Sequence, residues 1–110
     1  MKKYMMTYLG GNQPETPEEG KAHFEKYRQW LISLGDAILI PAAPLKNPST
    51  INPDGTITEG STTAMSGYTV IQAESAEAAL EMGKSCPFLE IGGSLEVSEM
   101  IEMADMRSQG

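Results

Sequence analysis

The sequence predicts an α+β fold, in which an antiparallel sheet carries two helices on one face. Short apolar stretches with strand character recur along the 110 residues, and two of them are followed by amphipathic helical segments. Segments rich in glycine or proline separate these elements. A chain of this length corresponds to one domain, so we expect residues 1–110 to fold together, with a loose tail after about residue 103.

The chain begins with a predicted strand and helix. Residues 4–9 are apolar and β-prone, and a glycine pair follows them. Thr16 can cap a helix, Pro17 suits its first position, and Glu19 can complete a capping box. Apolar residues then recur at spacings of three and four until Gly35, a natural helix stop. These positions are Phe24, Tyr27, Leu31 and Leu34.

The middle of the chain predicts a strand and a hairpin. Residues 37–40 form a short apolar run that Pro41 closes, and the proline-rich residues 41–48 are expected to be irregular. A Pro-Asp-Gly turn lies between Ile51 and Ile57, which predicts a small hairpin there.

The second half repeats the order of strand, helix and strand. Residues 68–73 have strand character, Ser75 can cap a second helix, and the Cys86-Pro87 step ends that helix. A face of small residues is expected on this helix. Apolar and polar residues alternate over 95–102, which predicts a half-buried strand. The small-residue face comprises Ala76, Ala79, Leu80 and Gly83, and the apolar strand positions are Leu95, Val97 and Ile101.

This order of elements predicts a split βαβ arrangement, the ferredoxin-like βαββαβ fold with an extra hairpin. Both helices then cover the same face of the sheet. The first strand is apolar on both sides, because Tyr4, Met6 and Tyr8 alternate with Met5 and Leu9. We therefore expect a second copy to cover the other face across a two-fold axis, giving a homodimer.

Composition and charge exclude several partners. The net charge of −7 repels nucleic acids and anionic membrane surfaces, and no cluster of basic residues offsets it. No segment is long enough to span a membrane. The single cysteine, Cys86, rules out an intrachain disulfide and a cysteine-rich metal site, so a reducing cytoplasm is the expected compartment.

Four stretches are informative because of their order and spacing along the chain. They are KYMMTY at 3–8, HFEKYRQWL at 23–31, GYTVIQAESAEAAL at 67–80 and GSLEV at 93–97. Together they resemble the YCII-related family, also known by its DGPF-type members. The resemblance covers nearly the whole chain. It implies a dimeric α+β barrel, in which two ferredoxin-like sheets face each other, with a small-molecule cleft in each subunit.

The resemblance also implies a catalytic role for His23, which matches the histidine of the His–Asp pair regarded as catalytic in some relatives. The acid is not retained, because Cys86-Pro87 stands where those relatives have Asp-Pro near the end of the second helix. The DGPF motif is altered as well. It reads Asp54-Gly55-Thr56-Ile57 in this chain.

Two interpretations of His23 and Cys86 stay open. His23 lies at the edge of the apolar helix stripe, where it either faces a cleft as a general acid or base or merely packs at the rim. Cys86 is either a thiol that His23 activates or a buried, inert one. Its place after a helix C-terminus disfavours the thiolate.

Four large aromatic residues are candidates for a ligand pocket, although core packing explains them equally well. They are Tyr8, Tyr27, Trp30 and Tyr68. No metal, nucleotide or flavin is predicted, because the carboxylates are dispersed and no phosphate-binding glycine loop is present.

Three functions are compatible with these residues. The first is a small-molecule enzyme that uses His23 as acid or base on a cyclic or aromatic substrate. The alternative is a non-catalytic ligand-binding or regulatory homodimer with the same pocket. A third, a purely structural or interaction module, requires an exposed apolar patch beyond the dimer face.

Overall fold

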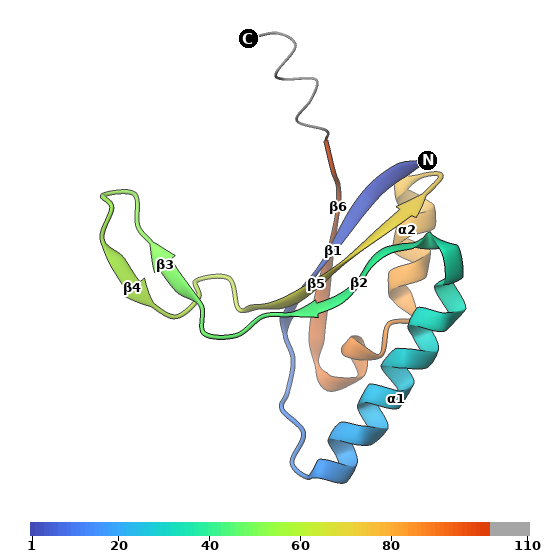
Figure 1. Ribbon diagram of the computed structural model, residues 1–110, viewed down its shortest axis with the longest axis horizontal. Helices are drawn as coiled ribbons and strands as arrows, with labels where there is room; N and C mark the ends of the chain where they lie inside the picture. Colours follow the sequence, from blue (N-terminus) through green and yellow to red (C-terminus); the bar gives the residue numbers. More distant parts are fainter. Residues whose placement is uncertain (102–110) are drawn as a thin grey trace, which may run out of the picture.

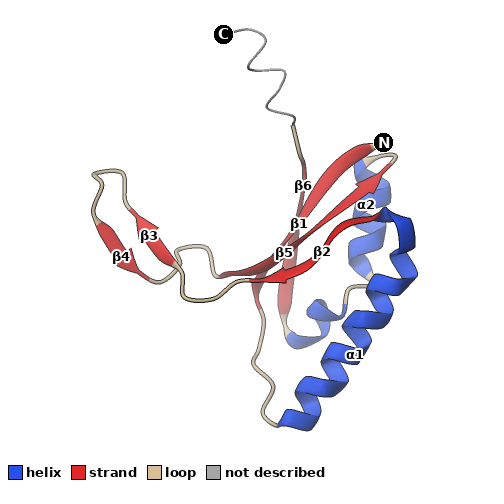
Figure 2. Ribbon diagram, in the orientation of Figure 1, coloured by secondary structure: helices blue, strands red, loops and turns tan. Residues whose placement is uncertain are grey.

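A computed structural model of the protein describes residues 1–101 as a four-stranded antiparallel sheet with two helices on one face (Figures 1 and 2). The sheet has the strand order β2-β5-β1-β6. Its strands are β1 (Lys2–Gly10), β2 (Ile38–Pro44), β5 (Met65–Ala73) and β6 (Gly93–Glu99). The helices are α1 (Pro17–Leu34) and α2 (Ala76–Lys84), with short 3₁₀ turns η1 (Gly35–Ala37) and η2 (Pro87–Ile91). This arrangement confirms the predicted α+β class and is ferredoxin-like.

Helix α1 begins where the sequence predicts. The Thr16 hydroxyl accepts a hydrogen bond from the Glu19 backbone amide at 3.1 Å. The Glu19 carboxylate accepts a hydrogen bond from the amide of Glu15 at 3.0 Å, one residue before the position that a standard capping box uses. The helix ends at Gly35, whose φ of +54° lies in the region that glycine adopts without strain.

Strands β1 and β5 begin two and three residues before their predicted starts, and β2 and β6 differ more clearly from the prediction. Strand β2 continues through Pro41 to Pro44, where the sequence predicts an irregular segment. Its edge position in the sheet explains this, because an edge strand tolerates residues without an amide hydrogen. Strand β6 ends at Glu99, and Ile101 is 77 % exposed instead of continuing the apolar face. The tail predicted to be loose lies outside the described residues.

Helix α2 has its predicted cap but a different buried face. The Ser75 hydroxyl accepts a hydrogen bond from the Ala78 amide at 3.1 Å. Ala79 and Gly83 are buried, whereas Leu80 is half exposed. The sequence also missed the 3₁₀ turn η2, which follows Cys86 and directs the buried Pro87 and Phe88 back under the sheet.

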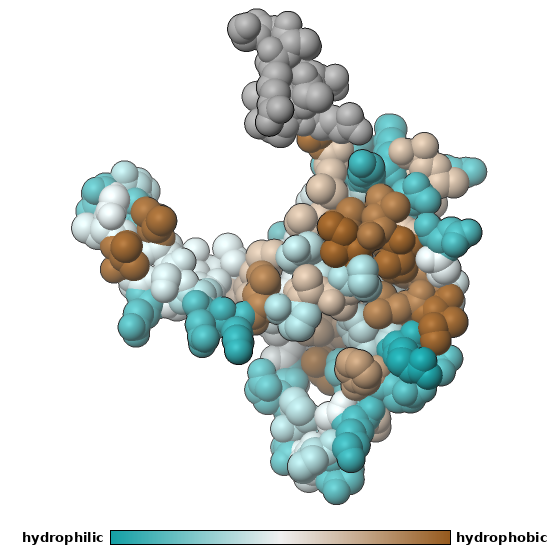
Figure 3. Space-filling view, viewed as in Figure 1, coloured by the Kyte–Doolittle hydropathy of each residue, from teal (hydrophilic) through white to brown (hydrophobic). Residues whose placement is uncertain are grey.

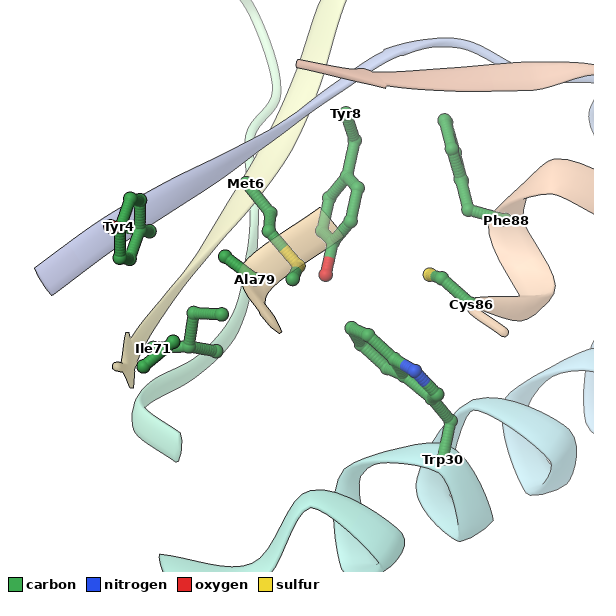
Figure 4. Close-up of a cluster of buried hydrophobic side chains, with 9 residues drawn as sticks. Tyr4, Met6, Tyr8, Trp30, Ile71, Ala79, Cys86 and Phe88 are labelled. Atoms are coloured by element: carbon green, nitrogen blue, oxygen red, sulfur yellow. The ribbon is translucent and has the colours of Figure 1, made fainter. Parts of the chain in front are cut away.

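The hydrophobic core lies between the sheet and the helices (Figure 4). Tyr4, Met6 and Tyr8 point from β1 toward the helices, and Met6 is completely buried. The remaining buried members of this core come from α1, β5, α2 and the segment around η2; they are Trp30, Ile71, Ala73, Ala79, Cys86 and Phe88.

The second face of the sheet has no helix over it (Figure 2). The pairing of Met5 with Val70 and of Thr7 with Tyr68 places these four residues on that open face. Val70 is 3 % exposed and the other three are half-buried. The open face therefore carries apolar surface, as the two-sided pattern of the first strand predicts.

The predicted hairpin projects from this body as an arm, defined here as residues 49–59. Its strands β3 (Ser49–Ile51) and β4 (Ile57–Glu59) pair only with each other. Figures 1 and 2 show the arm running beyond the end of the sheet and bending toward the open face.

No helix in the described part of the chain is both long and apolar enough to cross a membrane.

Candidate functional site

A cleft of about 340 Å³ opens between helix α1 and the adjoining end of the sheet. Its lining is almost entirely apolar. One face of α1 forms one wall, because Gly20 and Tyr27 each lie three or four residues from His23 and Phe24. The other lining residues come from β1, β2, β5, η2 and the loop before α1; they are Tyr8, Ala42, Pro44, Ser66, Phe88 and Pro14.

Aromatic rings form the inner part of the cleft. The ring centroids of Tyr8 and Phe88 lie 5.1 Å apart, and those of Tyr8 and Tyr27 lie 5.8 Å apart at an edge-to-face angle of 79°. Such pairs hold one another in fixed orientations. The His23 imidazole adjoins this cluster, with its centroid 6.2 Å from that of Tyr27.

Glycines make room for the Phe88 ring. A Cβ atom at Gly11 would lie 2.8 Å from this ring, closer than carbon atoms approach. Gly93 packs against the same ring, so a side chain there would displace it as well. The absence of side chains at Gly11 and Gly93 therefore sets the position of one wall of the cleft.

His23 also borders a second, polar hollow of about 370 Å³, which residues of the loop before α1 line as well. Three carboxylates line this hollow, those of Glu15, Glu19 and Glu90, together with Asn12 and Gln13. The Glu90 carboxylate forms an exposed ion pair with Lys26 at 3.5 Å. His23 is half-buried and thus lies where an apolar cleft and an acidic hollow meet.

The hydroxyl groups of the two cleft tyrosines differ in their hydrogen bonding. The Tyr8 hydroxyl is hydrogen-bonded to the Thr69 hydroxyl inside the core. Burial raises the pKa of Tyr8 well above its ordinary value, so its phenol is neutral at physiological pH. The Tyr27 hydroxyl is buried and has no hydrogen-bond partner among the described residues.

Cys86 lies in the core and lines neither hollow (Figure 4). Its side chain is placed between Phe88 and Trp30, and the residue is 2 % exposed. Burial raises the pKa of its thiol to about 11, which keeps it protonated at neutral pH. The surroundings of Cys86 are therefore those of a packing residue.

The four aromatic candidates separate into two groups. Tyr8 and Tyr27 line the cleft. Trp30 is buried behind them, and its indole Nε1 donates a hydrogen bond to the Met82 carbonyl at 3.0 Å. Tyr68 lies on the open face of the sheet, away from the cleft.

Sequence reasoning missed two aromatic residues of the cleft, Phe24 and Phe88. The helical spacing predicts Phe24 in the core stripe, but it is 68 % exposed at the cleft mouth, because α1 extends past the end of the sheet there. Phe88 follows the Cys86-Pro87 step in the 3₁₀ turn η2, and no helical or strand pattern in the sequence marks it as a cleft residue. Among residues 1–101 no group of three potential metal ligands comes together.

A comparison with solved structures finds the same fold in an enzyme. The chain resembles 5-chloro-2-hydroxyhydroquinone dehydrochlorinase from Burkholderia phenoliruptrix AC1100, solved in complex with 2,5-dihydroxybenzoquinone. The TM-score is 0.58 at 14% sequence identity, and the match covers 91% of this chain and 94% of the dehydrochlorinase. No family model and no curated protein sequence matches the chain. This similarity establishes the fold of the chain. In the dehydrochlorinase, the same fold belongs to an enzyme that acts on a small molecule.

Proposed function

We propose that this protein is a small-molecule enzyme of the YCII-related type, in which His23 acts as general acid or base on a ring compound held in the aromatic cleft. One observation carries the proposal. His23 is the half-buried titratable side chain that borders both the apolar cleft and the polar hollow. An imidazole at such a boundary can exchange a proton with a bound substrate on one side and with water on the other.

The form of the cleft supports a planar, largely apolar substrate. Its volume of about 340 Å³ suits a single substituted ring, and the walls offer the faces and edges of Tyr8, Tyr27 and Phe88. The dehydrochlorinase that shares the fold was solved with 2,5-dihydroxybenzoquinone. Hydroxylated rings of this kind are the substrate class that we propose for this chain, with proton transfer at a ring oxygen or carbon as the catalysed step.

A homodimer is part of the same proposal. The open sheet face carries the nearly buried Val70 beside the half-buried Met5 and Tyr68, without a helix to cover them. Packing two such faces against each other removes this apolar surface from water and produces a closed, two-fold assembly. The arrangement corresponds to the dimeric α+β barrel that the family resemblance implies.

The alternative is a non-catalytic ligand-binding or regulatory homodimer with the same cleft. A specific observation favours it. No hydrogen bond joins His23 to a carboxylate in the part of the chain that the structure describes, and Cys86 is a protonated thiol in the core. A histidine without an acidic partner is less strongly oriented for proton transfer.

The two functions are distinguished by separate measurements of binding and turnover. Binding is measured by titrating the ¹⁵N-labelled protein with 2,5-dihydroxybenzoquinone and following the amide signals of residues that line the cleft. Turnover is measured by ultraviolet absorbance with a panel of chlorinated and unchlorinated hydroxyhydroquinones. Binding together with turnover that His23→Gln abolishes supports the enzyme, whereas Lys21→Gln, an exposed change on the same helix, leaves both unchanged.

Binding without turnover of any compound in the panel favours the regulatory alternative. Amide shifts confined to the open sheet face or the arm, with none at the cleft, contradict both functions. Turnover that survives in His23→Gln at the wild-type rate contradicts the catalytic role of the imidazole.

A further inference from the structure

The arm has one polar face and one face on which two isoleucines lie next to the paired Ser49 and Glu59; the latter is called the apolar face here. Thr50 pairs with Thr58 on the first face, where the Asn52 amide donates hydrogen bonds to the hydroxyls of Thr58 at 2.9 Å and Thr56 at 3.1 Å. Asp54 accepts hydrogen bonds from the Thr56 amide and hydroxyl at 3.0 Å and 2.7 Å. The turn and the polar face are thus internally satisfied.

The apolar face has no such partners. Ile51 and Ile57 lie directly opposite each other in the pairing register, and they are 74 % and 72 % exposed. Figure 3 shows brown, hydrophobic atoms on the arm among pale and teal surroundings. Two opposed isoleucines on one side of an isolated hairpin form an apolar surface whose exposure to water is unfavourable in free energy. A two-stranded hairpin alone is also only marginally stable.

The position of the arm indicates what covers this face. The arm bends from the end of the sheet toward the open face, so the arm and the open face border one concave region (Figures 1 and 3). Strand β3 covers only the two residue steps from Ser49 to Ile51, about 7 Å, and the turn at residues 52–56 lengthens the arm beyond it. Facing sheets pack about 10 Å apart, a separation comparable with the length of the arm, so a sheet that rests on the open face comes within reach of the arm.

We infer that the apolar face of the arm, Ile51 and Ile57, contacts the body of a second copy of this chain and clamps the homodimer. The inference rests on the proposed dimer and adds a second contact to it, at the rim of the sheet interface. A two-fold axis makes each chain both donor and acceptor of an arm, so four isoleucines leave water in one dimer. The polar network keeps the arm extended before the copies meet, which reduces the entropy that docking removes.

Sedimentation equilibrium of the full chain tests the inference. The double variant Ile51→Thr/Ile57→Thr removes the apolar contact but keeps β-branched residues that suit a strand. We expect its dimer dissociation constant to rise at least about a hundredfold, tenfold for each of the two arms in the dimer. The control Ile32→Thr changes an isoleucine that is 58 % exposed on α1, and it should leave the constant unchanged.

A dissociation constant of the double variant equal to that of the wild type overturns the clamp and leaves the dimer intact. Thr7→Arg, in the middle of the open face, tests the dimer separately and should yield monomers. A wild-type chain that stays monomeric at high concentration contradicts the dimer itself, and the clamp with it.

Paramagnetic relaxation enhancement provides a second test of the contact between the arm and the second copy. It does not depend on the threonine substitutions. A spin label on Asp54→Cys, in a Cys86→Ala background, is mixed with ¹⁵N-labelled wild type that carries no spin label. Broadened amide signals in the ¹⁵N-labelled copy support contact between the arm and the second copy. Unbroadened signals in a sample that is dimeric by sedimentation overturn it.

Discussion

The Tyr8 and Thr69 hydroxyls are hydrogen-bonded to each other in the interior, across the two central strands of the sheet. Both side chains point toward the helices, and Thr69 is completely inaccessible to water. The pair satisfies two polar groups that would otherwise be buried alone. It also fixes the ring of Tyr8, which in turn contacts the rings of Phe88 and Tyr27 at the cleft.

Removal of one partner of this pair is expected to destabilise the fold. Tyr8→Phe leaves the Thr69 hydroxyl buried without its hydrogen-bond partner and should lower the free energy of unfolding by about 1–3 kcal/mol in urea titrations. Tyr8→Phe/Thr69→Val removes both polar groups, so it should recover part of the loss. Equal stability of Tyr8→Phe and the wild type would show that the hydrogen bond contributes nothing.

His23→Gln should lower kcat by about 10²–10⁴-fold for any substrate that the wild type converts, because general acid–base catalysis typically contributes that much. The substitution keeps the helix and changes a half-buried position, so the melting temperature should stay close to that of the wild type. The rate is compared with that of Lys21→Gln by absorbance. A melting temperature that drops sharply in His23→Gln would indicate a packing role for the imidazole instead.

Cys86 should react slowly with thiol reagents. Its pKa is raised from 9.0 to about 11, so the thiolate fraction at pH 8 is about a hundredfold smaller than that of an ordinary cysteine. Labelling by a chromogenic disulfide at pH 8 is therefore expected to be slow in the native protein and fast in urea. Rapid native labelling would contradict the buried position of this thiol.

The Cys86 thiol also makes the free energy of unfolding depend on pH in the alkaline range. The folded protein retains the Cys86 proton up to about pH 11, whereas the unfolded chain loses it near pH 9. Between these values the folded state binds more protons, so the free energy of unfolding must fall as the pH rises. Cys86→Ala should decline less steeply than the wild type over this interval in urea titrations at pH 8, 9, 10 and 11.

Two glycines should respond to alanine in opposite directions. A Cβ atom at Gly67 would lie 2.8 Å from the Ala43 carbonyl oxygen of the neighbouring strand, so Gly67→Ala must separate β5 from β2. We expect it to cost about 1–3 kcal/mol of unfolding free energy. At Gly20, within α1, the nearest atom would be 3.5 Å away, and alanine should stabilise the helix by up to about 1 kcal/mol.

Most of the fold could be predicted because local signals and sheet alternation agree. The Thr16 cap, the Pro-Asp-Gly turn and the alternation of the first strand each correspond to an observed element. The path of β2 through Pro41 could not be predicted, because a proline is tolerated only once the strand is known to lie at an edge. Edge position is a property of the whole sheet.

The site was less predictable than the fold. The helical spacing placed His23 beside Tyr27, and the structure brings both to one cleft. Tyr68 and Tyr8 look equivalent as strand tyrosines, yet the register puts them on opposite faces of the sheet. That distinction depends on which face the helices cover. Phe88 reaches the cleft through a 3₁₀ turn and two distant glycines, a long-range relationship that no local pattern contains.

The prolines of β2 have a consequence for how copies of this chain can associate. Pro41 and Pro44 lie on an outer strand of the sheet and have no amide hydrogen to donate. A fifth strand therefore cannot add along β2 with regular hydrogen bonding. Growth of fibrils along β2 is thus disfavoured, and the broad open face is the side on which the proposed two-fold contact closes after two copies.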